Sequence, residues 1–326
     1  MNVVDLLGPV VERVLSAGKL LSSEWHRIGG PRGHGDKAAI DSEIEAQLRL
    51  DLLELLHCDF WGEETGTHMT GHEYCWVVDP NDGTADFLQH RAGSAISVGL
   101  LHNAIPVLGV VYAPIAPDGG EDCISWAEGL PAIIRNRQTV HALLDQLRLT
   151  SNSVVLVSTA ATSKPELNAE LCAPAEFISM PSIAYRLARA AAGDAVVGTS
   201  LVPVSAHDVV GGHALLIGAG GVLIDQDGGP ITYESEERMR RFPCAASAEH
   251  LKHVKSLSLG TGSACFANNE LKTRTQPVLK AGNRLPSATI FEKAPLASAV
   301  MRRAGNQQLL APYAPRGAYR PISRVF

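Results

Sequence analysis

From residue 76 onward the chain reads Trp76-Val77-Val78-Asp79-Pro80-Asn81-Asp82-Gly83-Thr84-Ala85-Asp86-Phe87. An apolar, β-favouring run ends in two carboxylates three positions apart, and Gly-Thr and a segment that can begin a helix follow at once. Carboxylate oxygens bind hard cations, whereas the unpaired N–H groups at a helix start attract an anion such as phosphate. The run therefore predicts a point where a metal ion and a phosphate group meet.

The same residues also suit a polar turn without chemistry, because Asp, Pro, Asn and Gly each favour turns for local reasons. Two other acidic segments count against that interpretation. Residues 60–66 contain an apolar stretch that ends in Glu63 and Glu64, and residues 205–208 place Asp208 before a small-residue helix. Three acidic strand or loop ends call for one common explanation.

The chain resembles the inositol monophosphatase family, within the wider group of Mg-dependent, lithium-sensitive phosphatases. The family's first signature is an apolar run followed by Asp-Pro-x-Asp-Gly-Thr-x-x-Phe, and residues 76–87 match it at every defining position. The family's Gly-Glu-Glu appears as Gly62-Glu63-Glu64. Its second signature, Trp-Asp followed by Glu-Ala-Gly-Gly, appears in altered form as His207-Asp208 and Gly218-Ala219-Gly220-Gly221. The similarity covers roughly residues 1–255.

This resemblance implies a metal site with named ligands. Glu63, Asp79 and Asp82, with the backbone carbonyl of Asn81, would hold the first ions, and Asp208 would complete a second site. The family uses two or three Mg²⁺ ions, with Mn²⁺ as a substitute, and the attacking water lies between them. Two cations about 3.5–4 Å apart can stabilise both the attacking and the leaving oxygen of a phosphate ester.

The resemblance also implies which groups surround the water and the phosphate. Thr84 with Glu63 would orient and deprotonate the water, and Asp41 matches a further family acid near the site, although the usual Val-Thr before it is missing. Backbone N–H groups of Gly83 and Thr84 would hold the phosphate, and glycine lets the main chain approach closely. Glu64 would face away from Glu63, because adjacent residues on an extended strand point to opposite sides.

A rival phosphatase chemistry uses an aspartate nucleophile. Haloacid-dehalogenase-type enzymes carry an apolar strand that ends in Asp-x-Asp-Gly-Thr and form an aspartyl-phosphate. In this chain two residues, Pro80 and Asn81, separate the aspartates instead of one. The spacing therefore favours an activated water over a covalent intermediate.

The predicted function is Mg²⁺-dependent hydrolysis of a small phosphate monoester, such as an inositol, sugar or polyol phosphate. Leu201 stands where several relatives carry an inositol-binding acid, and its side chain cannot accept a hydrogen bond. Activity on 3′(2′),5′-bisphosphate nucleotides, sugar bisphosphates or histidinol phosphate therefore stays open. A non-enzyme alternative is a catalytically quiet relative that binds a phosphorylated ligand or a partner through a basic tail.

Hydrophobic periodicity outlines the elements. It predicts helices over residues 3–25 and 40–56, a loop over 27–36, strands over 74–78, 95–101, 106–112, 123–126 and 153–158, an amphipathic helix over 182–192, a strand over 195–197 and a helix over 208–218. This order fits the fold that the resemblance implies, an α/β (α+β) layered αβαβα sandwich of the inositol monophosphatase / fructose-1,6-bisphosphatase type. We expect an N-terminal metal-binding half over 1–140, a C-terminal α/β half over 150–258 and a basic, Pro-containing extension over 259–326.

Charge is unevenly distributed along the chain. Residues 260–326 carry ten Lys or Arg against two Glu, a net charge of +8, which leaves −14 for the remainder of a chain with a formal net charge of −6. We expect this tail to wrap the acidic body of its own or a neighbouring subunit. Its arginines could instead reach a second anionic group of the substrate. Nucleic-acid contact is the weakest option, since no aromatic or repeated pattern supports it.

Composition indicates a folded enzyme without a membrane segment. A chain of 326 residues with 45% hydrophobic content can build one large domain or two closely packed ones. The six cysteines have no Cys-x-x-Cys spacing, so we expect mostly buried, apolar thiols. No basic N-terminal region precedes an apolar stretch, and no 18-residue apolar run occurs. We expect a cytoplasmic homodimer whose partner is a small phosphate ester.

Overall fold

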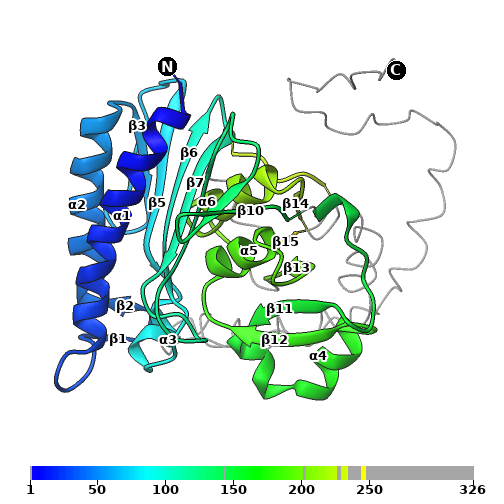
Figure 1. Ribbon diagram of the computed structural model, residues 1–326. Coiled ribbons are helices and arrows are strands. Elements are labelled where there is room, and N and C mark those ends of the chain that lie inside the picture. Colours follow the sequence, from blue (N-terminus) through cyan, green and yellow to red (C-terminus); the bar gives the residue numbers. More distant parts are fainter. Residues whose placement is uncertain (1, 143, 201–202, 226–228, 234–243, 247–326) are drawn as a thin grey trace, which may run out of the picture. The chain divides into compact units, whose positions relative to one another are not determined.

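The computed structural model describes residues 2–142, 144–200, 203–225, 229–233 and 244–246 (Figure 1). The chain divides into two units, Met1–Gln276 and Pro277–Phe326, and every described residue lies in the first. Leu201 and the predicted extension over 259–326 therefore lie outside the described residues.

Two long helices begin the chain, α1 (Val4–Trp25) and α2 (Ala39–Leu55), close to their predicted bounds. The predicted loop over residues 27–36 contains the short strand β1 (Gly33–His34), which pairs antiparallel with β2 (Lys37–Ala38) directly after the loop. Apolar residues at helical spacing on α1, such as Val10, Val14 and Leu21, are fully buried. Each helix thus presents one apolar face to the sheet beneath it.

A mixed sheet of eight strands follows, in the order β10-β9-β8-β7-β6-β5-β3-β4. Its strands are β3 (Asp59–Gly62), β4 (Thr67–His68), β5 (Tyr74–Asp82), β6 (Ala95–His102), β7 (Ile105–Ala113), β8 (Asp122–Ala127), β9 (Ile133–Arg135) and β10 (Gln138–Val140). Strands β3 and β5 pair in parallel, and the other neighbours pair antiparallel, as an antiparallel-rich sheet requires. Strand β5 continues past its predicted end at residue 78 and carries the acidic motif itself.

Both faces of this sheet are covered by helices. On β5, Trp76 and Val78 belong to the core that contains α1 and α2, whereas Val77 belongs to the core that contains α5 (Ile183–Ala191) and α6 (Ala206–Gly218). Figure 1 shows α1 and α2 on one side of the sheet and α5 and α6 on the other. The strand therefore reads as a nearly continuous apolar run because neither of its faces meets water.

A smaller parallel sheet forms the next layer, in the order β12 (Glu176–Met180), β11 (Val154–Ser158), β13 (Val197–Gly198). Leu156 of β11 packs into the core with α5, whereas Val155 and Val157 pack against Ala161 and Cys172 on the other side. Those two residues lie on η2 (Thr159–Ser163) and α4 (Pro165–Cys172). The layers therefore alternate as αβαβα, which confirms the predicted fold class.

Some elements differ from the sequence-based expectation. Helix α5 is buried on nearly every side, with Arg189 as its one residue outside the buried set, because it lies in the middle layer between two sheets. Strand β13 begins at Val197, later than predicted. The predictions did not include β9, β10, β12 or α4. The structure also contains η1 (Leu144–Gln146) and an antiparallel pair of β14 (Leu223–Asp225) and β15 (Cys244–Ala246).

The predicted division into halves stays a prediction. The large sheet ends with β10 at Val140, and the small sheet begins with β11 at Val154. However, α5 and α6 lie beyond that boundary in sequence and pack on the large sheet.

The cysteines and the helices agree with the compositional expectations as far as they are described. Cys58, Cys75, Cys123 and Cys172 are free thiols and are buried. Within the described part of the chain, no helix combines the length and the apolar character needed to cross a membrane.

Candidate metal centre

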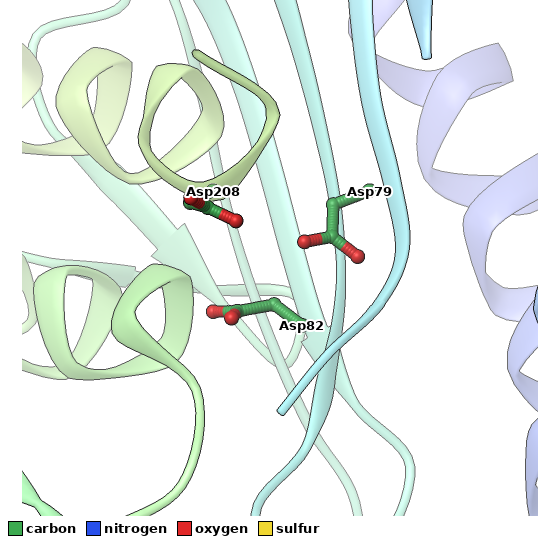
Figure 2. Close-up of side chains that lie close together, drawn as sticks. All are labelled: Asp79, Asp82 and Asp208. Carbon is green, nitrogen blue, oxygen red and sulfur yellow. The ribbon is translucent and has the colours of Figure 1, made fainter. Parts of the chain in front are cut away.

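The acidic motif lies where β5 departs from a regular ladder. Asp79 pairs with Ser97 and Asp82 pairs with Ala95 of β6, and the register shifts between these two pairs. An irregularity of this kind bends a strand and redirects its side chains. Figure 2 shows the result: the carboxylates of Asp79 and Asp82 are both turned toward Asp208.

Gly83 follows the last residue of β5 and precedes the short helix α3 (Thr84–Leu88), in agreement with the predicted helix start. Its φ is 95°, and a Cβ at this position would lie 3.0 Å from the backbone N of Ser182. A left-handed backbone and a close main-chain approach both require glycine. Gly83 is thus the point where the sheet meets the turn before α5.

Asp208 comes from the first turn of α6. Its carboxylate accepts a hydrogen bond from the backbone N–H of Ser205, within a capping box at the helix start. Helix α6 lies close to the sheet because glycines face each other there: a Cβ on Gly109 would lie 2.3 Å from the carbonyl oxygen of Gly211. This packing carries Asp208 over the end of β5.

Three carboxylates converge from these elements. One oxygen each of Asp79, Asp82 and Asp208 lies within 4.8 Å of the other two (Figure 2). Removal from water raises the pKa of Asp82 and of Asp208 to about 6. Burial and the charges of neighbouring acids raise the pKa of Asp79 well above its usual value. Removal from water and mutual repulsion both oppose the state in which all three carboxylates are ionised. A divalent cation bound between their oxygens would supply positive charge and favour that state.

Glu63 lies at the rim of this acidic group. It follows β3, its side chain is exposed, and its N–H donates to the carbonyl oxygen of Val78 at 3.3 Å. Partial removal of water, followed by the charges of Asp208 and Asp82, raises the pKa of Glu63, while a hydrogen bond with Asp79 lowers it. The group of three oxygens within 4.8 Å does not include Glu63. The structure therefore brings it near the other acids without placing it among them.

Glu45, on α2, holds the turn that carries Glu63. It is fully buried, and its two carboxylate oxygens accept hydrogen bonds from the backbone N–H groups of Glu64 at 2.9 Å and Thr65 at 2.6 Å. A Cβ on Gly62 would lie 2.2 Å from Glu45 Oε1, so glycine is needed there. The Glu64 carboxylate is exposed and accepts a hydrogen bond from Ser42, away from this contact.

A hydrogen-bonded group lies beneath the motif. Asp41, Asn81 and Thr84 are all buried. Asp41 accepts hydrogen bonds from Asn81 Nδ2 at 3.0 Å, from Thr84 Oγ1 at 3.1 Å and from the N–H of Ala38 at 3.3 Å. Thr84 Oγ1 also lies 2.8 Å from the carbonyl oxygen of Asn81. Burial raises the pKa of Asp41 to about 6, although these hydrogen bonds lower it.

Asp82 is tied to the start of α5. Its Oδ2 accepts hydrogen bonds from Ser182 Oγ and from the backbone N–H of Ala184, both at 2.6 Å. The positive charge of Arg186 favours the ionised forms of Asp82 and Asp208. His207, which stands at the position of the family's Trp, is half-buried, with Nε2 3.6 Å from Asp208 Oδ1.

Sequence reasoning missed Glu45, Ser182 and Arg186. Glu45 follows Asp41 by one helical turn, so their shared face could have been noticed on α2. Ser182 stands at the predicted helix start, where a capping serine is expected. Its bond to Asp82, 100 positions earlier in the chain, has no local signal.

A model of the inositol monophosphatase family matches residues 10–258. The chain belongs to the inositol monophosphatase family. Members of this family are phosphatases, that is, hydrolases of phosphoric monoesters.

Individual relatives agree with this assignment. The inositol-1-monophosphatase of Synechocystis sp. is 29% identical over 165 residues, which cover 48% of this chain and 56% of that protein. Inositol monophosphatase 1 of Solanum lycopersicum is 27% identical over 273 residues, which cover 78% of this chain and 95% of the relative. The structure of inositol monophosphatase from Anabaena (Nostoc) sp. has a TM-score of 0.61 and 23% identity and covers 78% of this chain and 94% of that one. The structural likeness shows a shared fold.

Proposed function

We propose that this chain hydrolyses a small phosphate monoester with the help of two or three Mg²⁺ ions, for which Mn²⁺ can substitute. The observation that carries the proposal is the convergence of Asp79, Asp82 and Asp208 within 4.8 Å, at the end of the strand that bears the family signature. Three acids of this kind at the edge of a purely structural turn would only repel one another.

The proposed metal ligands come from three parts of the chain. Asp79, Asp82 and Asp208 would bind through their carboxylates, Glu63 from the rim, and Asn81 through its backbone carbonyl. When bound, the ions supply positive charge that screens the anionic ester and stabilises charge on its oxygens. Oxygen ligands of this hardness favour Mg²⁺ over softer transition metals.

The groups beneath the motif would orient the attacking water. Thr84 has one hydroxyl hydrogen, and the two groups within hydrogen-bond distance of its oxygen, Asp41 Oδ2 and Asn81 O, are both acceptors. With its hydrogen engaged there, the Thr84 oxygen keeps lone pairs that can accept a hydrogen from water. Glu63, exposed at the rim, would take the proton that the water loses.

The phosphate would bind at the start of α3. Gly83 and Thr84 would offer their backbone N–H groups to its oxygens, and the absent Cβ of Gly83 leaves room for that approach. Because α3 has only five residues, direct N–H contacts matter more here than a helix dipole.

We also propose, on the family resemblance alone, that the chain works as a homodimer in the cytoplasm, with the small ester as its partner. Light scattering on the purified full chain measures the mass in solution. A monomer at working concentration would contradict the dimer without affecting the proposed chemistry.

A phosphate-release screen tests the activity. The full chain is assayed with Mg²⁺, with Mn²⁺ and with EDTA on inositol 1-phosphate, sugar phosphates, histidinol phosphate and a 3′-phosphonucleotide. We expect Mg²⁺-dependent release from at least one of the small esters, and less than about 1% of that rate in Asp82→Asn, because a metal ligand is lost while the fold persists. The matched control is Asp5→Asn, which alters an exposed acid in the first turn of α1 and should keep full activity.

Two outcomes would overturn the proposal. One is release that is unaffected by EDTA or by Asp82→Asn. The other is a phosphorylated Asp79 trapped by acid quench during turnover, which would establish the aspartyl-phosphate route in place of activated water.

A further inference from the structure

The turn before α5 holds a residue in an unusual backbone conformation. Ser182 has φ 52° and ψ 110° and is buried. A residue with a Cβ rarely adopts positive φ, and such strain persists only where the surroundings enforce it. Glycine would relieve the strain, so the presence of serine points to a use for its side chain.

The Ser182 hydroxyl is engaged as acceptor and as donor. It accepts a hydrogen bond from the backbone N–H of Tyr185 at 2.9 Å, which caps α5. Because that bond uses a lone pair, the hydroxyl hydrogen is directed to Asp82 Oδ2 at 2.6 Å. A hydroxyl with one hydrogen thus has a single orientation that satisfies both partners.

Asp82 receives a second bond on the same oxygen. The backbone N–H of Ala184 also donates to Oδ2 at 2.6 Å. Two donors on one oxygen fix the plane of the carboxylate and leave Oδ1 as the oxygen available to a cation. Ser182 therefore controls the orientation of a proposed metal ligand that lies 100 positions earlier in the chain.

The strained turn is held in place from behind by Arg186. This buried side chain donates from Nη1 to the carbonyl oxygens of Met180 at 2.8 Å and Pro181 at 3.3 Å, and from Nε to that of Thr199 at 3.1 Å. These bonds fix the residues that precede Ser182. Arg186 belongs to α5, the helix that Ser182 caps, so a side chain of this helix holds the backbone that leads into the positive φ of Ser182.

We propose that Ser182 is a positioning residue for the metal centre: its hydroxyl orients Asp82 for cation binding, and the chain tolerates a strained backbone at this position to keep that hydroxyl. The inference rests on the proposed function, because it assumes that Asp82 binds a cation. It assigns Ser182 no contact with the substrate.

Three substitutions separate the hydroxyl from the backbone strain. Ser182→Gly removes the hydroxyl and relieves the strain, Ser182→Ala removes the hydroxyl and keeps the strain, and Ser182→Thr keeps a hydroxyl but adds a β-branch at positive φ. The matched control is Ser158→Ala, which removes another capping hydroxyl, that of η2, bonded to the N–H of Ala160.

The measurement is the melting temperature of the metal-free full chain during titration with MgCl₂, which needs no turnover. We expect the half-saturating Mg²⁺ concentration to rise about 10–100-fold in Ser182→Gly and Ser182→Ala, as for other partners of metal ligands. Ser182→Thr and Ser158→Ala should stay within about threefold of the unaltered chain. In EDTA, Ser182→Gly should melt at or above the unaltered chain and Ser182→Thr below it. Ser182→Gly would then bind Mg²⁺ more weakly than Ser182→Thr but melt at a higher temperature in EDTA.

If Ser182 served only to stabilise the fold, the variant with the lower melting temperature in EDTA would also be the one that binds Mg²⁺ more weakly. The inference is overturned if Ser182→Gly binds Mg²⁺ within twofold of the unaltered chain, or if Ser182→Thr binds as weakly as Ser182→Gly. Should Ser182→Ala fail to fold, the comparison of Gly with Thr decides. If Mg²⁺ and Mn²⁺ leave the melting temperature of the unaltered chain unchanged, the proposed function fails as well, which distinguishes the two failures.

Discussion

The buried carboxylates Asp59 and Asp79 differ in how many hydrogen bonds they accept and in the direction of their pKa shifts. Asp59, at the start of β3, accepts hydrogen bonds from Thr70 Oγ1 and from the N–H groups of Thr70, Gly71 and His72. Burial alone would raise its pKa, but these bonds outweigh that effect and lower it. Asp79 accepts a bond from the N–H of Asn81 at 2.8 Å, and its pKa is raised. The hydrogen bonds within the protein are enough to stabilise the charge of Asp59, whereas those to Asp79 are not.

Asp59→Asn tests whether the ionised, hydrogen-bonded carboxylate of Asp59 stabilises the fold. At pH 7 we expect it to lower the free energy of unfolding by about 2 kcal/mol, because the amide presents an N–H₂ to a site built from donors. The measurement is urea unfolding of both chains across pH. A lowered folded-state pKa stabilises the fold above the unfolded value of 3.8, and this contribution disappears as pH falls through the folded pKa.

The difference between the two chains should therefore shrink below about pH 4. A difference that stays constant from pH 7 to pH 3 would show that the charge of Asp59 contributes nothing. The phosphatase activity of Asp59→Asn should remain, since Asp59 lies outside the acidic group.

The sequence singled out the acids of the candidate site, but it gave no sign of most of the groups that hold them in place. Asp79 and Asp82 follow from a local motif, so their placement at the end of a strand could be predicted from spacing and apolar character alone. Ser182 and Glu45 act through bonds to Asp82 and to the backbone of Glu64, which are distant in sequence. Contacts of that kind depend on the packed fold and leave no periodic pattern.

Among the elements, α6 decides whether the acidic group forms. It carries Asp208, and it approaches the sheet through glycine contacts: a Cβ on Gly99 would lie 2.4 Å from Val210, and one on Gly109 would lie 2.3 Å from the Gly211 carbonyl. Side chains at these positions would lift the helix from β6 and β7. The distance between Asp208 and Asp79 thus depends on the absence of two methyl groups.

Gly109→Ala tests this dependence. We expect a loss of about 1–3 kcal/mol in the free energy of unfolding, since the methyl group has no space, together with weaker Mg²⁺ binding because Asp208 moves. Urea unfolding and an Mg²⁺ titration measure the two effects. The control is Gly8→Ala on α1, where nothing lies within 4 Å of the added Cβ and helix propensity should raise stability. Equal Mg²⁺ affinity in Gly109→Ala and the unaltered chain would contradict the role given to α6.

Long periodic elements were predictable and short ones were not. Helix α1 and strands β6 and β7 have clear periods or apolar runs, and their observed bounds lie within one or two residues of prediction. Strand β12 alternates between exposed and partly buried residues at a sheet edge, and α4 has eight residues. Such short elements are fixed by their neighbours more than by their own composition.

At the scale of the whole molecule, the candidate centre joins segments that are far apart in the sequence. Asp79 and Asp82 come from β5 of the large sheet, and Asp208 comes from α6, which begins much later in the chain, at Ala206. The family match, over residues 10–258, includes all three. A cation bound between them would therefore stabilise contacts that are far apart in sequence, and metal removal should loosen them.

The most direct test is calorimetric titration of Mg²⁺ into the metal-free full chain and into Asp208→Asn. We expect Mg²⁺ to bind to the unaltered chain and its affinity for the variant to be at least about tenfold lower, which corresponds to about 1.4 kcal/mol. Without metal, Asp208→Asn should be at least as stable as the unaltered chain, because one of three crowded carboxylates is neutralised. Equal Mg²⁺ affinity in the two chains, or no binding to either, would contradict the claim that these acids form a metal centre.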